Sequence, residues 1–278
     1  MGKCKAAAMK SEPAILSKPA KPPGAGFWQK GLDFLLPPLC FSCRAPVEVQ
    51  GGLCARCWSG LRFITKPYCT SCGFPFAHEM PAGLVCGSCH SYPPVFARAR
   101  AAVGYDIGSR PVILSFKHGE RTEGLATLAG WLKNAGADLL EECDVIIPVP
   151  LHPRRLFKRR FNQSALLARA LGETTGKAVD VFSLKRKKNT RSQGGLNARQ
   201  RRQNVRAAFM VPRDKRPAIK GQRVLLIDDV MTTGATAENC TRALNAAGAE
   251  KVLVLTLARV VEPLRKGADK KKNSHAKS

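Results

Sequence analysis

The chain has 278 residues, of which 44% are hydrophobic, and this predicts a globular protein of one or two domains with a core of ordinary size. Lys and Arg outnumber Asp and Glu by 46 to 20. The formal net charge of +26 favours a polyanionic partner such as nucleic acid, a phosphorylated metabolite or anionic lipid. The sequence has no apolar run long enough to span a bilayer, and no apolar stretch of secretory-signal length follows its basic start. A transmembrane protein is therefore excluded, and a cytoplasmic location is predicted.

Both ends of the chain are predicted to be disordered basic tails. Residues 1–26 consist mainly of Ala, Pro and Lys, and residues 263–278 are rich in Lys. Between the first tail and the cysteines, "FWQKGLDFLLPP" (residues 27–38) has the pattern of a short amphipathic helix. Such a helix lies on a membrane surface or packs on the neighbouring domain, and we favour packing.

Eight of the eleven cysteines form four Cys-x-x-Cys pairs. The pairs are Cys40/Cys43, Cys54/Cys57, Cys69/Cys72 and Cys86/Cys89. Two thiolates separated by two residues can bind one tetrahedral ion, and a second pair from a facing hairpin completes a closed zinc site. Ten residues separate the first two pairs and thirteen separate the last two. Residues 27–95 are therefore predicted to be a double zinc ribbon, with a leading helix and structural zinc on all eight cysteines.

Three other uses of these cysteines are less favoured. Disulfides need an oxidising compartment, and no export signal accompanies them. Redox dithiols usually come one pair to a domain. "CGSCH" (residues 86–90) matches the c-type haem attachment pattern, but that chemistry also needs export, and the fourth pair completes the ribbons.

The order of the pairs favours sequential sites, with the first two pairs in one site and the last two in the other, over interleaved sites. Because a structural zinc site supplies its own folding energy, losing Cys69 and Cys72 is expected to unfold one ribbon and to spare residues after about Ala97. Cys143 and Cys240 lie outside the pattern and are predicted to be small buried residues rather than reactive thiols.

From residue 96 to residue 262 the pattern alternates between strands and helices. Predicted strands are 97–106, 143–150, 178–184, 223–228 and 251–259; predicted helices are 111–118, 122–142, 162–175 and 234–248. Apolar strands separated by helices indicate a mostly parallel sheet with helices on both faces. The predicted fold class of this second domain is therefore α/β.

One predicted strand ends in a pattern suited to a sugar phosphate. Its apolar residues 225–227 are followed by Asp228 and Asp229, at the carboxyl end of the strand, where open parallel sheets bind ligands. Four further residues, Thr232, Thr233, Gly234 and Thr236, open the next helix. A helix N-terminus favours an anion, and adjacent carboxylates can accept hydrogen bonds from a vicinal diol. A ribose 5′-phosphate would suit both features, with its hydroxyls on the two acids and its phosphate in the loop at the start of the helix.

The positive charge is concentrated between Arg154 and Arg223. This segment contains 21 Lys and Arg and three acids, which gives a net charge of +18. Within it, "LKRKKNTRSQGGLNARQRR" (residues 184–202) has the charge and glycine content of a mobile lid, or of a disordered connector. Arg199, Arg202 and Arg206 would face one way on a helix starting near residue 196.

Several of these motifs together resemble a known family. "VLLIDDVMTTGAT" (residues 224–236) closely resembles the phosphoribosyl pyrophosphate motif of type I phosphoribosyltransferases. With the four cysteine pairs ahead of it, and with "PVPLHPRRLFKRRFNQSALLARAL" (148–171) and "NTRSQGGLNARQRRQNVRAAF" (189–209), the chain looks like the ComF family, also called competence protein F. The resemblance covers about residues 30–260 and the order of all the motifs.

The resemblance implies a double zinc ribbon followed by a type I phosphoribosyltransferase-like domain that binds phosphoribosyl pyrophosphate with Mg²⁺. It implies displacement at the ribose anomeric carbon, with Asp228, Asp229 and Arg199 as the candidate catalytic residues. The loop from Thr232 to Thr236 would bind the phosphate. Arg154 and Arg155 follow a strand end that faces pyrophosphate in this fold; otherwise they belong to a solvated loop or a nucleic-acid patch.

Two positions refine these implications. Arg160 stands where family members often have glycine, which leaves the backbone of its loop undetermined. Thr232 stands near the place where purine-salvage enzymes often have an acid that exchanges a proton with the base, so a 6-oxopurine acceptor is disfavoured.

Two functions are consistent with the sequence. The first is a phosphoribosyltransferase-type protein of unknown acceptor. The second is an accessory protein of DNA uptake that works beside a helicase or recombination proteins. In this function the ribbons and the basic segment bind single- or double-stranded DNA, and the sugar-phosphate pocket is regulatory or vestigial. The intact acidic and threonine motif favours the first. The few aromatic residues in the basic segment weaken a single-strand stacking surface.

Overall fold

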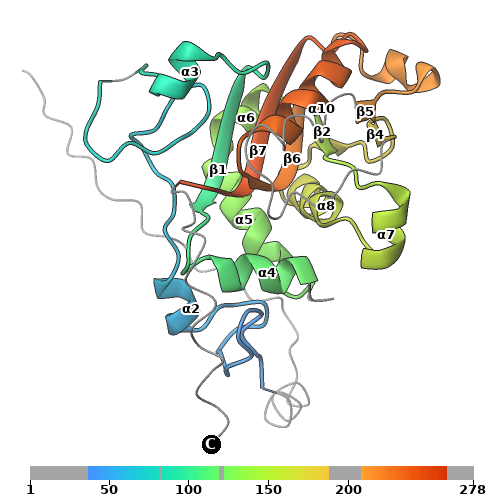
Figure 1. The fold of residues 1–278 in the computed structure, drawn as a ribbon. Helices are drawn as coiled ribbons and strands as arrows, with labels where there is room; N and C mark the ends of the chain where they lie inside the picture. The colour runs from blue at the N-terminus through green and yellow to red at the C-terminus, as the bar shows by residue number, and fades with distance from the viewer. Residues whose placement is uncertain (1–36, 82, 119–121, 188–207, 262–278) are drawn as a thin grey trace, which may run out of the picture. The chain divides into compact units, whose positions relative to one another are not determined.

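The structure is a computed structural model, and it describes residues 37–81, 83–118, 122–187 and 208–261 (Figure 1). The predicted tails, residues 27–36 of the helix predicted over 27–38, and the segment 188–207 with Arg199, Arg202 and Arg206 lie outside these ranges. Within them, no helix combines the length and the hydropathy that crossing a bilayer requires.

The centre of the fold is a parallel sheet with the strand order β1-β7-β6-β2-β3 (Figure 1). In this order the strands are β1 (Arg98–Gly104), β7 (Lys251–Arg259), β6 (Arg223–Met231), β2 (Val145–Pro148) and β3 (Ala178–Val179). The central strands are buried along most of their length because helices or a hairpin cover both faces of the sheet. This accounts for the unbroken apolar runs in the sequence and confirms the predicted α/β class.

Two hydrophobic clusters form the core, one on each face of the sheet. The first cluster joins the sheet to α4 (Arg110–His118), α5 (Leu125–Ala135), α6 (Ala137–Glu142) and α8 (Gln163–Thr175). The second cluster joins it to α10 (Ala235–Asn245), to Ile219 after the 3-10 helix η1 (Arg213–Ala218), and to Leu184, Ala208, Phe209 and Val211 at the antiparallel pair β4 (Lys185–Arg186) and β5 (Phe209–Met210). The strands and helices that were predicted occur in the predicted order, but β4, β5 and η1 were not predicted, and β4 lies at the start of the segment 184–202 that was predicted to be a lid or a connector.

Two predicted elements are wrong in extent. The helix predicted over 122–142 is two helices, α5 and α6, separated at Gly136. Leu255 of β7 fills the space that a side chain at this position would need, because a Cβ there would lie 2.6 Å from the leucine Cδ2. The strand predicted over 178–184 stops at Val179, because Asp180 Oδ1 accepts hydrogen bonds from the backbone N–H groups of residues 182 and 183 and turns the chain.

The cysteine-rich region contains two similar units. Each unit has a short antiparallel bridge, Leu39 to Pro46 in the first and Tyr68 to Pro75 in the second. Each then has a one-turn helix whose N-cap is a cysteine, with α2 (Ala55–Ser59) in the first and α3 (Gly87–Ser91) in the second. The repeat places the four cysteines of each unit at equivalent positions.

The second ribbon contacts the edge of the sheet directly. The backbone N–H of Ala99 in β1 donates to the carbonyl of Ser71 over 2.7 Å, and Arg100 Nη1 donates to the carbonyl of Thr70 over 3.1 Å. Cys72 packs against the second hydrophobic cluster. These contacts change the expectation that loss of this ribbon spares the sheet, since residues of β1 would lose hydrogen-bond partners.

Candidate metal centres and anion-binding loop

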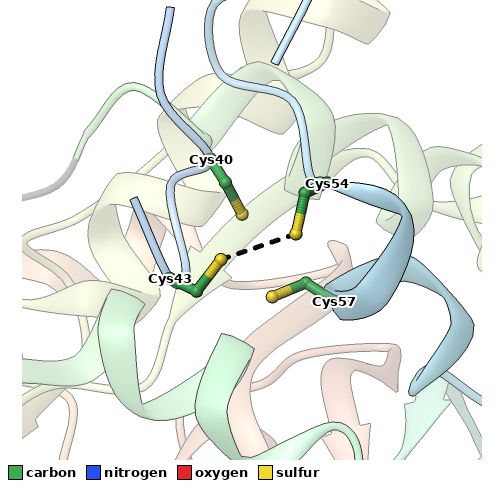
Figure 2. A group of neighbouring side chains, drawn as sticks. All are labelled: Cys40, Cys43, Cys54 and Cys57. Carbon is green, nitrogen blue, oxygen red and sulfur yellow. Dashed lines mark hydrogen bonds between the residues drawn. The ribbon is translucent and has the colours of Figure 1, made fainter. Parts of the chain in front are cut away.

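The first candidate metal centre is formed by Cys40, Cys43, Cys54 and Cys57. Their sulfur atoms all lie within 4.8 Å of one another and point toward a common centre (Figure 2). The Sγ atoms of Cys43 and Cys54 are 3.5 Å apart. A tetrahedral zinc ion with Zn–S bonds of about 2.3 Å holds its sulfurs about 3.8 Å apart, so this arrangement fits zinc.

The second candidate centre is formed by Cys69, Cys72, Cys86 and Cys89, whose sulfurs also lie within 4.8 Å of one another. The Sγ atoms of Cys72 and Cys86 are 3.8 Å apart. The backbone N–H groups of these two residues also point toward Cys69 Sγ, over 3.4 and 3.2 Å. The two groups confirm sequential pairing.

The backbone prepares one thiol of each group for metal binding. Burial opposes ionisation of Cys40, but backbone N–H groups, chiefly those of Cys43 and Cys54, outweigh it and lower the pKa to about 6. The same balance lowers the pKa of Cys69 to about 7. Burial and the neighbouring thiols instead raise the pKa of Cys57 to about 12. Metal binding therefore has to displace protons, as it does in structural zinc sites.

The two ribbons differ at the residue that follows the first Cys-x-x-Cys pair. Both residues adopt a left-handed backbone, with φ of 67° at Arg44 and 70° at Gly73. An L side chain in this region costs about 1–2 kcal/mol. The first ribbon therefore carries a strained arginine where the second has glycine.

We expect Arg44→Gly to raise the stability of the zinc-loaded protein by about 1 kcal/mol, because glycine relieves the left-handed strain. The ion pair that Arg44 forms with Glu123 spans 3.8 Å between half-exposed side chains, and its loss costs little. Thermal unfolding should show a melting temperature about 2–4 °C higher. The reverse change, Gly73→Arg, should lower it, because a Cβ at that position would lie 2.6 Å from the carbonyl oxygen of Ala99. A lower melting temperature for Arg44→Gly would contradict the strain argument.

The two adjacent acids lie where β6 continues beyond its neighbour β2. Pairing between these strands ends at Pro148 and Ile227, whereas β6 continues to Met231 beside β7. Asp228 Oδ1 accepts hydrogen bonds from Ser164 Oγ at 3.2 Å and from the backbone N–H of Asp229 at 2.9 Å. Asp229 Oδ1 accepts one from the N–H of the next residue at 2.7 Å. The backbone and α8 thus orient both carboxylates.

The loop after β6 has the features of an anion site. Gly234, with φ of 76°, is the N-cap of α10, which has 11 residues. Thr233 Oγ1 is buried, and it has no hydrogen-bond partner within the described ranges. A small pocket is lined by Asp228, Val230, Met231, Thr232, Gly234, Ala235, Thr236, Ala237 and Thr256. An unpartnered buried hydroxyl beside a helix N-terminus suits a phosphate group, which would accept its hydrogen bond.

The basic segment after β2 starts beside the acids. The N–H of Val149 donates to the carbonyl of Ile227 over 2.9 Å, and the chain then forms α7 (Pro153–Arg159). His152 caps this helix by accepting from the N–H of Arg154, whose side chain is exposed. The side chain of Arg155 lies outside the described part of the structure.

Arg160 ends α7 with φ of 65°, a conformation that favours glycine. Members of the family that the sequence resembles often have glycine here, and the backbone of Arg160 has the geometry that glycine adopts without strain. The next residues return the chain to the sheet. Asn162 caps α8 and donates from Nδ2 to the carbonyl of Val149 over 3.0 Å.

Two residues beside the site were missed in the sequence. Ser164 donates to Asp228, and Thr256 is the β7 residue that pairs with Asp228. The only signal for Ser164 was its place two residues after the helix cap at Asn162. Thr256 stood out only as a hydroxyl within an apolar strand, and both assignments required the tertiary structure.

A buried arginine links the second ribbon to the end of the sheet. Arg259, the last residue of β7, donates from Nη1 to the carbonyl of Cys72, and its guanidinium carbon lies 5.2 Å from the ring centroid of Phe74. Arg259 pairs with Met231, directly before the anion-binding loop, and the N–H of Val260 donates to the carbonyl of Met231. The second metal centre is thus connected to the loop through the backbone of two strand ends.

The fold and the cysteine groups define a zinc-ribbon protein with a phosphoribosyltransferase domain. Models of two families match: the double zinc ribbon domain over residues 31–90 and the phosphoribosyl transferase domain over residues 165–278. The chain is 33% identical to the DNA utilization protein YhgH of Salmonella typhimurium, over 81% of this chain and 99% of that one. It is 32% identical to competence protein F of Haemophilus influenzae, over 79% and 96% of the two chains. The chain belongs to the ComF family.

Among solved structures, a glutamine phosphoribosylpyrophosphate amidotransferase from B. subtilis is similar at 22% identity, over 52% of this chain and 30% of that one, with a TM-score of 0.33.

Proposed function

We propose that this protein binds phosphoribosyl pyrophosphate together with Mg²⁺ and acts as a phosphoribosyltransferase. The observation that carries the proposal is the buried, unpartnered hydroxyl of Thr233 at the start of α10, next to the oriented carboxylates of Asp228 and Asp229. The loop from Thr232 to Thr236 would hold the 5′-phosphate, and the two acids would accept hydrogen bonds from the ribose hydroxyls.

In the proposed reaction the bond between the anomeric carbon and pyrophosphate breaks, and a bond to an acceptor forms. The protein contributes by holding the ribose in place and by placing positive charge near the leaving group. Arg154 and Arg155 in α7, and Arg199 outside the described ranges, are the side chains we propose for that charge. Asp228 and Asp229 are carboxylates of the kind that Mg²⁺ prefers, and the ion would neutralise pyrophosphate charge when bound. Thr232 argues against a 6-oxopurine acceptor.

We also propose a division of the chain into a ribbon region over residues 27–95, a phosphoribosyltransferase-like domain over 96–262, and tails at 1–26 and 263–278. A cytoplasmic location agrees with thiols that are held for zinc rather than paired in disulfides.

Calorimetry with the full zinc-loaded chain tests the proposed ligand. We expect phosphoribosyl pyrophosphate to bind in the presence of Mg²⁺ with one site per chain, and to bind more weakly when the metal is withheld. Ribose 5-phosphate should bind more weakly because it lacks the pyrophosphate. A folded, zinc-loaded protein that binds neither compound would contradict the proposal.

A second candidate function is binding of DNA, and two observations favour it. The segment from Arg154 to Arg223 has a net charge of +18, and Phe157 on α7 is 92% exposed among basic residues. The names of two relatives refer to DNA utilization and to competence. In this role the protein would handle DNA beside an uptake helicase or recombination proteins, and Phe157 would stack on a base.

We expect the affinity for a short single-stranded DNA to fall about a hundredfold between 50 and 200 mM salt, if about five phosphates are contacted. Fluorescence anisotropy of a labelled oligonucleotide measures this. Phe157→Ala should weaken binding about tenfold, because stacking on one base is worth about 1–3 kcal/mol. Ile107→Ala is the control, since Ile107 is an apolar residue that is 80% exposed but lies outside both the ribbons and the basic segment. Affinity that does not change with salt would rule out binding through phosphates.

A further inference from the structure

A second cavity lies between the second ribbon and the sheet, with a volume of about 600 Å³. This volume falls within the range of small-molecule sites, about 300–1,000 Å³. Tyr68, Phe76 and Met80 of the ribbon line one side, and residues of β1, α5 and α6 line the other. The cavity therefore combines aromatic walls from one part of the chain with polar groups from another.

This cavity is separate from the anion-binding loop. Within the described ranges the two pockets share no lining residue. The cavity borders α5 and α6, whose side chains belong to the first hydrophobic cluster, whereas the loop opens α10 in the second cluster on the opposite face of the sheet. A ligand in the cavity would not touch Asp228 or Thr233.

Arg100 supplies buried positive charge to the cavity. Only 6% of this residue is exposed. Its Nη1 donates to the carbonyls of Thr70 and Ala99, and its Nη2 donates to Asp138 Oδ2 over 3.0 Å. Its Nε is buried and has no partner among the described residues. An unpartnered donor on a buried cation is costly unless a ligand accepts from it.

The lining as a whole carries more positive than negative charge. Lys66, Arg98 and Arg100 line the cavity together with one acid, Asp138. Arg98 and Arg100 both contact Oδ2 of this acid, and Arg98 also pairs with Glu142. Lys66 is exposed at the cavity. The charge that remains after these pairings favours an anionic ligand.

The walls favour a flat, apolar ligand body. The guanidinium of Arg100 lies over the ring of Tyr68, with its carbon 4.6 Å from the centroid. This contact holds the ring in one orientation. The half-buried ring of Phe76 also lines the cavity, and the exposed side chain of Met80 adds a flexible apolar surface.

We propose that this cavity binds a small organic anion with a planar aromatic body. The anionic group would lie near Arg100 and Lys66, and the ring would lie against Tyr68 and Phe76. Because both guanidinium contacts of Asp138 use Oδ2, its Oδ1 faces no described cation and can accept a hydrogen bond from the ligand. This chemistry is distinct from that of the sugar-phosphate site.

The probe is 8-anilinonaphthalene-1-sulfonate, an aromatic anion whose fluorescence rises on binding, titrated into the full zinc-loaded chain. We expect one saturable site per chain. Ala137→Trp should weaken binding at least tenfold, because Ala137 is an exposed lining residue at the start of α6 and the indole would fill the cavity. Ala178→Trp is the matched control, on the exposed first residue of β3 at the other sheet edge. Both variants should keep the melting temperature, since neither residue is buried. Equal binding by both tryptophan variants would overturn the proposal.

Charge is tested with a second pair of variants. Lys66→Gln should weaken binding of the sulfonate about threefold to fivefold, an effect of the size of one exposed charge contact. Lys220→Gln, at an exposed residue outside the lining, should leave it unchanged. The uncharged analogue N-phenyl-1-naphthylamine should bind weakly and should not respond to Lys66→Gln. Tight binding of this analogue would remove the anionic part of the proposal, and displacement of the probe by inorganic phosphate alone would remove the aromatic part.

Discussion

Replacing Cys69 and Cys72 together by serine should leave one zinc ion per chain instead of two and should destabilise the sheet as well as the ribbon. The zinc ion of the second ribbon is lost because the variant removes two of its four ligands. The sheet is affected because the second ribbon supplies carbonyl acceptors to Arg100 in β1 and to Arg259 in β7, both almost fully buried. Hydrogen bonds to charged groups are worth about 1.5–3 kcal/mol each, so two of them amount to about 3–6 kcal/mol.

We expect the melting temperature of this variant to fall by about 6–24 °C, since 1 kcal/mol corresponds to about 2–4 °C in a domain of this size. Metal analysis and thermal unfolding measure the two effects separately. Cys143→Ser is the matched control, because it changes a buried cysteine outside both metal groups and should keep two zinc ions. If the double variant lost one zinc ion while the sheet melted as in the unmodified chain, the ribbon would be an independent unit.

Asp229→Asn should weaken binding of phosphoribosyl pyrophosphate by about tenfold to a hundredfold without unfolding the protein. The amide oxygen can still accept the hydrogen bond from the N–H of Val230, so the local backbone is kept. The charge is lost, and a charge-assisted hydrogen bond to a ribose hydroxyl is worth about 1.5–3 kcal/mol. Asp214→Asn, at an exposed acid in η1, is the matched control and should bind as the unmodified chain does.

Thr233→Val tests the phosphate-binding loop, and it is measured by melting temperature as well as by ligand affinity. Because Thr233 Oγ1 is buried without a described partner, removing the hydroxyl should keep or raise the melting temperature while ligand affinity falls about tenfold. Thr241→Val is a close control, since Thr241 Oγ1 is also buried without a described partner but lies further along α10, away from the loop at the start of this helix. It should bind the ligand normally. A folded Asp229→Asn/Thr233→Val double variant with unchanged ligand affinity would remove the pocket from the proposed function.

The sequence by itself determined the metal groups and the sheet. Two thiol pairs at this spacing can bind one tetrahedral ion, so two zinc sites were expected from local chemistry, and the order of the pairs favoured the sequential groups Cys40–Cys57 and Cys69–Cys89. Strands such as 251–259 are buried on both faces and therefore carry apolar residues at most positions. The motif around Asp228 was visible because its residues are adjacent in the chain. Burial of Cys143 and Cys240 was also predicted correctly.

Only the tertiary structure decided the features that depend on distant segments. Gly136, between α5 and α6, has no room for a side chain because Leu255, more than a hundred residues later, occupies the space beside it. Ser164 orients Asp228 across a separation of 64 residues, and the stacking of Arg100 on Tyr68 joins a ribbon to a strand. Local patterns record a residue's own burial and its neighbours in sequence. They carry no information on which partner fills a space or satisfies a donor, because that depends on how separate elements pack.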